Sequence, residues 1–287
     1  MQRTNPGGRF DYTTVGHVTI DVMADGTRRP GGSAFYSALQ ASRLGLRALI
    51  LTRGRPDEIV PLLEPYRDEL DLDIQPAAQT TTLQTSGSGA TRSQRVLAWA
   101  GPIEGEPVVD SAILHLAPVA RESPQRWRGE VDFVGLTPQG LVRRWSADGG
   151  EISLIAIDAG ALEPRCDAIV ISEVERASCA ALLARASSAG TVAAVTAGHR
   201  PTTILLPGGG MLRVATPPTE EPGEDMGAGD VFAAAFFVAL RDGIPPHAAA
   251  AFAGAAAALR IATHGTGGIA ERSAIESRVR SAALPGG

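Results

Sequence analysis

Short apolar segments separated by helical stretches constrain the fold of this 287-residue chain more than any other feature. Each segment is four or five residues long and is rich in Val, Ile, Leu and Ala, which is typical of a buried strand. Strands that alternate with helices predict a mostly parallel sheet covered on both faces. We therefore expect a three-layer α/β/α fold whose sheet includes the segments Ala112 to Leu116, Asp132 to Leu136, Ala168 to Ile171, Val192 to Thr196 and Thr202 to Leu206.

The segments on either side of this pattern extend the same architecture. Leu46 to Thr52 is predicted to be another buried strand. Helices are expected at Ser33 to Leu44, with Ser33 as its cap, at Pro56 to Leu70, at Ala228 to Leu240 and at His247 to Ile261. The sequence contains no internal repeat and no long linker, so residues 1–287 are expected to form a single domain.

A second, smaller group of strands contains too few apolar residues to form a core. Tyr12 to Val22 alternates in polarity, and Thr80 to Gln84 and Gln94 to Trp99 have the pattern of a hairpin. We expect residues of about 12–30 and 80–100 to form a small β lid over the main sheet.

Composition excludes several classes of function. All 26 basic residues are arginine, so a Walker A phosphate loop, a Schiff-base site and a pyridoxal phosphate site are excluded, because each needs a lysine. A net charge of -5 with scattered arginines does not favour nucleic-acid binding. The longest apolar run, Ala248 to Leu259, is shorter than the ~20 residues that a membrane span needs, and the N-terminus lacks an apolar signal core. These features predict a cytoplasmic protein with no membrane partner.

The segment Gly227-Ala228-Gly229-Asp230 carries the clearest chemical signal, because it stands directly before an apolar helix. Small residues allow backbone N–H groups to approach a ligand closely, and the start of a helix favours an anion such as a phosphoryl group. A carboxylate repels such an anion unless it has a separate role. Asp230 could accept a proton from an attacking hydroxyl, or it could simply cap the helix, and the chemistry alone leaves both roles open.

This segment resembles the C-terminal signature D-[TP]-x-G-A-G-D-x-F of the ribokinase-like (phosphofructokinase-B type) carbohydrate kinases. Gly31 and Gly32, followed by a helix that ends in Arg43-Leu44-Gly45, resemble the N-terminal signature of the same family. The resemblance implies that Asp230 is the catalytic base and that Gly227, Ala228 and Gly229 form the anion hole. It also implies that the paired glycines line the substrate site.

Weaker matches to the family fill the middle of the chain. They imply substrate contacts for Asp21 and Gln139, and nucleotide contacts for Thr196 and Gly198 in a T-x-G turn. Ser172 to Glu175 stands where relatives carry N-x-x-E, which implies that Glu175 contacts magnesium through water. The predicted lid strands are similar to those of the inositol-kinase-like branch, and they imply a substrate contact for Arg95 unless that arginine is a solvated edge residue.

Four positions depart from the family pattern. Tyr36 replaces an Asn of the first signature, Ser172 replaces the Asn of N-x-x-E, and Glu224 replaces the Asp that precedes the anion hole. Gly254 stands where an Asn near adenine is usual. Tyr36 is still assigned to the substrate site, and Ser172 and Glu224 to the cofactor site.

The reaction that the resemblance implies is phosphoryl transfer from ATP, with Mg²⁺, to a hydroxyl of an inositol-like polyol, a hexose or a pentose. A monovalent cation as a further cofactor and a homodimer are left open. The alternatives are a nucleoside kinase and a catalytically impaired relative that only binds a small molecule. A dinucleotide-dependent oxidoreductase is disfavoured, because no G-x-G-x-x-G follows the first strand at Thr19 to Asp21.

Overall fold

A nine-stranded sheet forms the centre of the computed structural model, which describes residues 8–87, 93–124, 126–158, 166–219 and 223–283. The strand order is β16 (Met211–Val214), β15 (Arg200–Leu205), β14 (Val192–Ala197), β13 (Ala168–Ser172), β9 (Val131–Leu136), β8 (Ser111–Leu116), β1 (Phe10–Val15), β4 (Ala48–Gly54) and β5 (Leu70–Pro76). The strands from β14 to β5 pair in parallel, whereas β15 and β16 are antiparallel.

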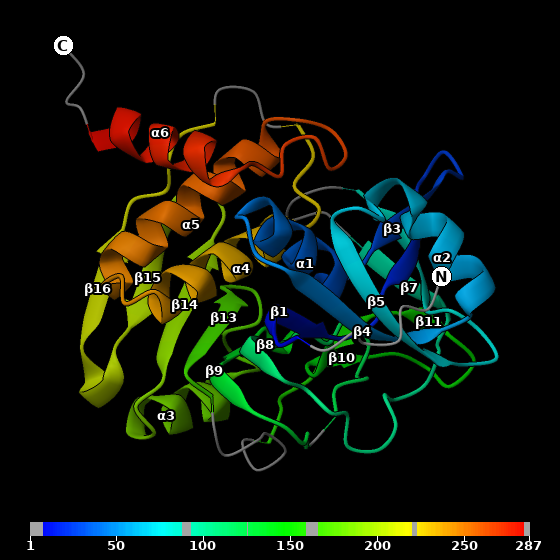
Figure 1. The fold of residues 1–287 in the computed structure, drawn as a ribbon. Coiled ribbons are helices and arrows are strands. Elements are labelled where there is room, and N and C mark those ends of the chain that lie inside the picture. The colour runs from blue at the N-terminus through cyan, green and yellow to red at the C-terminus, as the bar shows by residue number, and fades with distance from the viewer. Residues whose placement is uncertain (1–7, 88–92, 125, 159–165, 220–222, 284–287) are drawn as a thin grey trace.

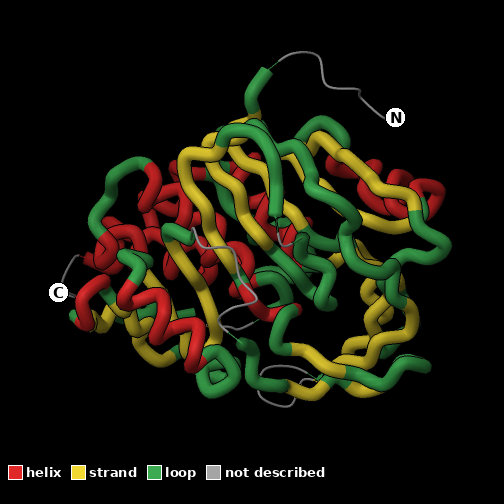
Figure 2. The backbone as a smooth tube through the Cα atoms, turned by 90° about the horizontal axis from the view of Figure 1, so that it is seen from below, coloured by secondary structure: helices red, strands yellow, loops and turns green. Residues whose placement is uncertain are grey.

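Helices cover both faces of this sheet because neighbouring strand residues point to opposite sides. On β8, Ile113 packs into the cluster shared with the helices α1 (Ser33–Arg43), α4 (Ala228–Arg241) and α5 (Pro246–Ile261). The next residue, Leu114, packs into the opposite cluster with α3 (Ala180–Ser188). The outer helix α6 (Arg272–Ala283) lies on α5 (Figure 1), and Figure 2 shows the same layers from below. The predicted three-layer fold is confirmed.

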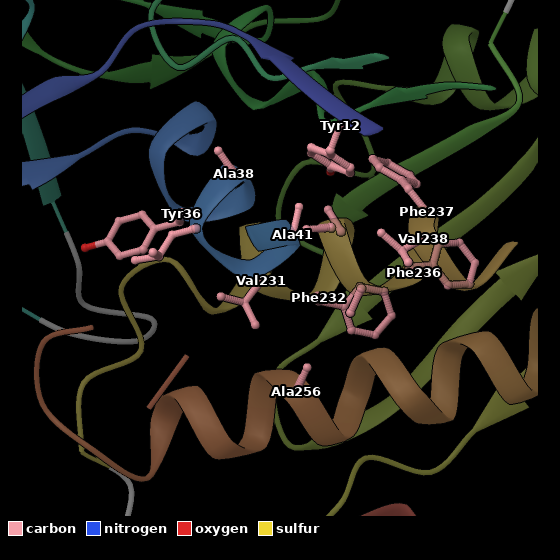
Figure 3. Close-up of a cluster of buried hydrophobic side chains, with 14 of the residues drawn as sticks. Tyr12, Tyr36, Ala38, Ala41, Val231, Phe232, Phe236, Phe237, Val238 and Ala256 are labelled. Carbon is pink, nitrogen blue, oxygen red and sulfur yellow. The ribbon is translucent and has the colours of Figure 1, made fainter. Parts of the chain in front are cut away.

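The helix α4 lies between α1 and α5 and fills the core on that side (Figure 3). Phe232, Phe236 and Phe237 of α4 are buried, and Ala256 of α5 faces them. Alanines on α5 allow its backbone to lie close to α4, so the Gly227–Asp230 segment at the start of α4 rests on a rigid support. None of the helices in the described ranges combines the length and the apolar character that crossing a membrane requires.

A second sheet of five strands lies beside the first (Figure 1). Its order is β11 (Gly150–Glu151), β7 (Ser93–Ala98), β6 (Thr82–Ser86), β2 (Thr19–Val22) and β3 (Arg28–Gly31). Leu83 and Val96 pack against Val119 and Ala120, which follow β8. A short pair, β10 (Arg143–Arg144) with β12 (Ser153–Leu154), completes the strands around this region.

Three sequence expectations about local structure are wrong. The stretch Tyr12 to Val22 is not one strand but two, and β1 enters the large sheet while β2 enters the small one. The helix predicted to reach Leu70 ends early, because α2 covers Pro56–Leu63, a 3-10 turn follows at Glu64–Tyr66, and Leu70 begins the edge strand β5. Ser33 makes no capping hydrogen bond, since Gly32 is the residue that precedes the helix.

Candidate functional site

A pocket of about 130 Å³ lies where α1 and α4 begin, next to the five-stranded sheet. Six of the predicted site residues line it, and they come from segments as far apart in sequence as β2 and α4. The lining residues are Asp21, Gly32, Ser33, Tyr36, Leu83, Gln94, Val119, Gln139, Arg143, Met226, Gly227 and Asp230. The structure therefore brings both glycine-containing motifs and the carboxylates of Asp21 and Asp230 to one cavity.

The turn at Gly227 forms the floor of this pocket and begins α4. Gly227 has a left-handed backbone (φ 77°), and a Cβ at this position would meet the ring of Tyr36 about 2.5 Å away. Only glycine combines this backbone with such close contact. The N–H groups in the first turn of a helix have no partner inside the helix, and Gly229 is exposed, so this end of α4 offers donors and a positive dipole end to an anion.

The carboxyl group of Asp230 lies in the first turn of α4 and lines the same pocket. Burial raises its pKa from 3.8 to about 6, with further raising contributions from Glu175 and Asp21. The hydroxyl of Ser33 and the guanidinium of Arg143 act in the opposite direction and lower this pKa. A carboxylate with a pKa close to neutral is suited to accept a proton from an attacking hydroxyl.

Asp21 lies at the other end of the pocket, on β2. Its side chain is 3% exposed, and its Oδ1 accepts a hydrogen bond of 2.7 Å from the Thr19 hydroxyl. β2 pairs with β3, which places Asp21 opposite Arg29 and close to Gly31. A Cβ on Gly31 would collide with the Asp21 carboxylate, which explains the small residue at this position. Asp21 and the double glycine therefore lie in direct contact across the pairing of β2 with β3.

Arg143 and Gln94 add polar groups that the sequence analysis did not assign to the site. Arg143 is only 7% exposed. It donates a hydrogen bond of 2.9 Å to the Val119 carbonyl and one of 2.7 Å to Oε1 of Gln94. Arg143 is one of the arginines that the sequence leaves scattered, and the structure shows it buried at the pocket. The weak family match that includes Gln139 extends to Arg143, and this match was the signal that could have identified it.

Glu122 is a second residue that the sequence analysis missed. It is fully buried, and its carboxylate accepts backbone N–H groups from His17 (2.8 Å), Val119 (2.7 Å) and Ala120 (2.6 Å). These bonds hold the segment of Val119, which lines the pocket, against the segment that connects β1 to β2. Two of these bonds join Glu122 to residues two and three positions away, but the bond to His17 spans 105 positions, and no sequence pattern indicates that long-range contact.

Arg95 does not line the pocket. It is exposed on β7, opposite Gln84 and Glu151, while its neighbour Gln94 points to the cavity. Since successive strand residues face opposite sides, the predicted contact is displaced by one residue.

The predicted cofactor residues lie outside this pocket. Glu175 is buried, and its Oε2 accepts two hydrogen bonds of 2.8 Å, from the backbone N–H and the hydroxyl of Ser172. Thr196 is the penultimate residue of β14, and its hydroxyl donates a hydrogen bond of 3.2 Å to the Ile171 carbonyl, while Gly198 is exposed in the turn to β15. The carboxylate of Glu224 accepts a hydrogen bond of 3.1 Å from the Gly265 N–H. Its Oε2 also lies 3.4 Å from Nη1 of Arg29.

No group of three or more His, Cys, Asp or Glu residues in the described parts of the chain could hold a metal ion. Mg²⁺ is commonly held by one or two carboxylates together with waters and substrate phosphates. The residues present fit this arrangement of carboxylate, waters and phosphates, with Glu175 as a candidate contact through water. They do not fit a site in which protein groups alone surround the ion.

Comparisons with known proteins agree with this architecture. Residues 163–272 match the pfkB family carbohydrate kinase, whereas none of the curated protein sequences matches the chain. The structure is similar to Arabidopsis thaliana ribokinase complexed with ribose and ATP, with 16% sequence identity and a TM-score of 0.72, over 95% of this chain and 99% of the other.

Two further structures belong to the same group. One is a pyrophosphate-dependent kinase in the ribokinase family complexed with a pyrophosphate analog and myo-inositol (20% identity, TM-score 0.68, 92% of this chain and 99% of the other). The other is fructokinase from Vibrio cholerae O395 (17% identity, TM-score 0.67, 94% and 99%). The chain therefore has the ribokinase-family fold, and its residues 163–272 carry the sequence pattern of the pfkB family carbohydrate kinases.

Proposed function

We propose that this protein transfers a phosphoryl group from ATP to a hydroxyl of a small sugar or polyol. The observation that carries the proposal is the position of Asp230, whose carboxyl group lies beside the Gly227 turn in the pocket that also contains Asp21 and Gln139. This arrangement supplies a base, an anion site and hydroxyl-binding groups within one cavity. The match of residues 163–272 to a carbohydrate kinase family supports the same reaction class.

The proposed reaction uses Asp230 as general base. The acceptor oxygen forms a bond to the γ-phosphorus, the bond between that phosphorus and the β–γ bridging oxygen breaks, and ADP leaves with the electron pair. The hydroxyl proton passes to the Asp230 carboxylate. Charge on the transferred group is stabilised by N–H groups of Gly227, Ala228 and Gly229 and by the dipole of α4.

When Mg²⁺ is bound, it neutralises negative charge on the donor phosphates. In this chain Glu175 and its partner Ser172 are the proposed residues on that side, with contact through water. Thr196 and Gly198 are proposed to contact the nucleotide, as the family pattern implies.

The acceptor is proposed to be small and rich in hydroxyl groups. The pocket volume of about 130 Å³ is smaller than the roughly 300 Å³ at which pockets for drug-sized ligands begin. Its polar lining pairs acceptors with donors, namely the carboxylate of Asp21, the amides of Gln94 and Gln139 and the guanidinium of Arg143. An inositol-like polyol, a hexose or a pentose fits this chemistry, and a nucleoside is the alternative.

Pyrophosphate is a second candidate donor, which two observations favour. Several of the similar structures are pyrophosphate-dependent kinases. In addition, a Cβ on Gly254 would lie 3.3 Å from Pro217, so this α5 position, where relatives carry an Asn near adenine, offers no side-chain amide and is covered by a proline. A pyrophosphate donor needs the anion site but no pocket for adenine.

A product-release screen tests the proposal. Polyols, hexoses, pentoses and nucleosides are combined with Mg²⁺ and either ATP or pyrophosphate, and ADP or phosphate release is measured. Acceptor-dependent release with a polyol or sugar is expected. Acceptor binding by calorimetry without product release from either donor would contradict the proposal and favour the impaired, binding-only alternative.

A further inference from the structure

Arg260 in the last turn of α5 is the largest fully buried side chain among the described residues. Its exposed fraction is 0%, and the helix around it consists mainly of alanine. Burying a guanidinium removes it from water, which is costly unless the surroundings compensate its charge. A buried arginine in an apolar helix therefore needs a structural or functional reason.

Three oxygen atoms lie around this guanidinium. Nη1 donates hydrogen bonds of 3.1 Å to the Glu224 carbonyl and 3.2 Å to the Thr263 carbonyl. Nη2 lies 4.0 Å from Oε2 of Glu224, and neither Nη2 nor Nε has a hydrogen-bond partner among the described residues. Carbonyl and carboxylate oxygens that converge in this way are the ligands that hard metal cations prefer. Here a protein cation occupies their centre.

Two contacts connect this charge to the anion-binding turn. Glu224 begins the segment that leads to Gly227, and its carboxylate also accepts the N–H of Gly265. The guanidinium carbon lies 5.7 Å from the centre of the Tyr36 ring, and that ring lies directly against Gly227. Arg260 thus contacts both the segment and the ring that fix the position of the turn.

We propose that Arg260 is a positioning residue that acts as a tethered monovalent cation for the anion-binding turn. It holds residues 224–227 against residues 263–265 and adds a permanent positive charge behind the turn, where little solvent screens it. The oxygen cluster is filled by the guanidinium, so the residues here do not fit a dissociable monovalent cation, and phosphoryl transfer is independent of K⁺ and Na⁺. This inference rests on the proposed function for its catalytic consequence, but not for its effect on cation binding.

The test compares the wild type with Arg260→Ala in buffers that contain K⁺, guanidinium or only tetramethylammonium. The wild type is expected to show the same turnover and melting temperature, within about twofold and about 2 °C, in all three buffers. Arg260→Ala is expected to lose roughly 10-fold to 100-fold in kcat in tetramethylammonium and to recover much of it in K⁺ or guanidinium. Its melting temperature should rise by more than about 2 °C with the small cations. Arg272→Ala, which removes a half-buried arginine from the ring of Phe252, is the matched control and should respond to none of them.

The outcomes separate this inference from the proposed function. A wild type that requires K⁺ for turnover, or that K⁺ stabilises relative to tetramethylammonium, overturns the inference whatever the acceptor proves to be. An Arg260→Ala variant that folds but neither loses activity nor responds to small cations also overturns it. If that variant does not fold, Arg260→Lys keeps the charge and is expected to fold and remain independent of K⁺, and K⁺ dependence in it would contradict the inference. Absence of product release by the wild type counts against the proposed function alone, since the melting temperatures still report cation binding.

Discussion

The proposed phosphoryl-transfer end of the pocket comes from one continuous segment, whereas the proposed acceptor end is assembled from β2, β7 and the stretch around Arg143. Gly227 and Asp230 lie within one helical turn of each other at the start of α4, so local geometry fixes their relation. Asp21, Gln94 and Arg143 are far apart in sequence, and they line one pocket only because the small sheet packs beside the large one. The comparison teaches that the proposed base and anion site can be formed by one short segment, whereas the groups proposed to bind the acceptor depend on contacts between distant parts of the chain.

The largest expected effect is at the local end. Asp230→Asn removes the proposed base but keeps the shape of the side chain, so kcat should fall by roughly 10²-fold to 10⁴-fold, with little change in the KM for ATP. Steady-state kinetics with the acceptor found in the product-release screen would measure this. Asp242→Asn, exposed at the far end of α4, serves as control, and near-wild-type turnover of Asp230→Asn would refute the assignment.

Gly227→Ala should damage the same end through backbone and packing. A residue with a Cβ is strained at φ 77°, and the new methyl group would meet the Tyr36 ring. We expect a loss of about 1–3 kcal/mol in the free energy of unfolding by urea, together with reduced turnover. Gly208→Ala is the matched control, because Gly208 has φ 78° but no atoms within 4 Å of its added Cβ. Equal destabilisation by both variants would show that Tyr36 contact contributes nothing.

The pH dependence links the two ends of the pocket. The proposed base must be ionised, and burial raises its pKa to about 6, so kcat/KM should be constant above that pH and fall about tenfold per pH unit below it. Arg143 lowers this pKa, and Arg143→Gln should therefore move the midpoint to higher pH. A pH–rate profile of both proteins measures the shift. A midpoint that stays fixed, or that moves downward, would contradict the proposed coupling.

The smallest effects are expected on β7. Gln94→Ala removes a pocket-lining amide and should raise the KM for the acceptor roughly threefold to tenfold, as expected for one hydrogen bond. Arg95→Ala, one residue away and exposed, should change it by less than about twofold. A larger effect of Arg95→Ala than of Gln94→Ala would reverse the orientation of β7 described here.

The same comparison explains how much could be predicted from the sequence. The α4 segment, its glycines and its Asp230 are correctly located because helix periodicity and small residues are local signals. The α/β architecture follows for the same reason. β5 was missed although Asp71 and Asp73 alternate with apolar residues as in an edge strand, because the helix predicted from Pro56 was extended to Leu70, the residue that begins this strand.

Long-range contacts could not be read from a single sequence. Tyr36 was predicted as a site residue, but not that its ring packs on Gly227 from about 190 residues away. Arg260 gave only one weak signal, a charged residue at the end of the longest apolar run. Its carbonyl partners at Glu224 and Thr263 become visible only when α5 is packed beside α4.

The most direct test of the central claim is a crystal structure of Asp230→Asn with Mg²⁺, donor and the identified acceptor bound. The account predicts that the reacting hydroxyl lies within about 2.6–3.2 Å of the residue 230 side chain and that the transferable phosphoryl group faces the N–H groups at the start of α4. An acceptor bound in this pocket with its reacting hydroxyl turned away from position 230, or a donor phosphate far from the Gly227 turn, would contradict it.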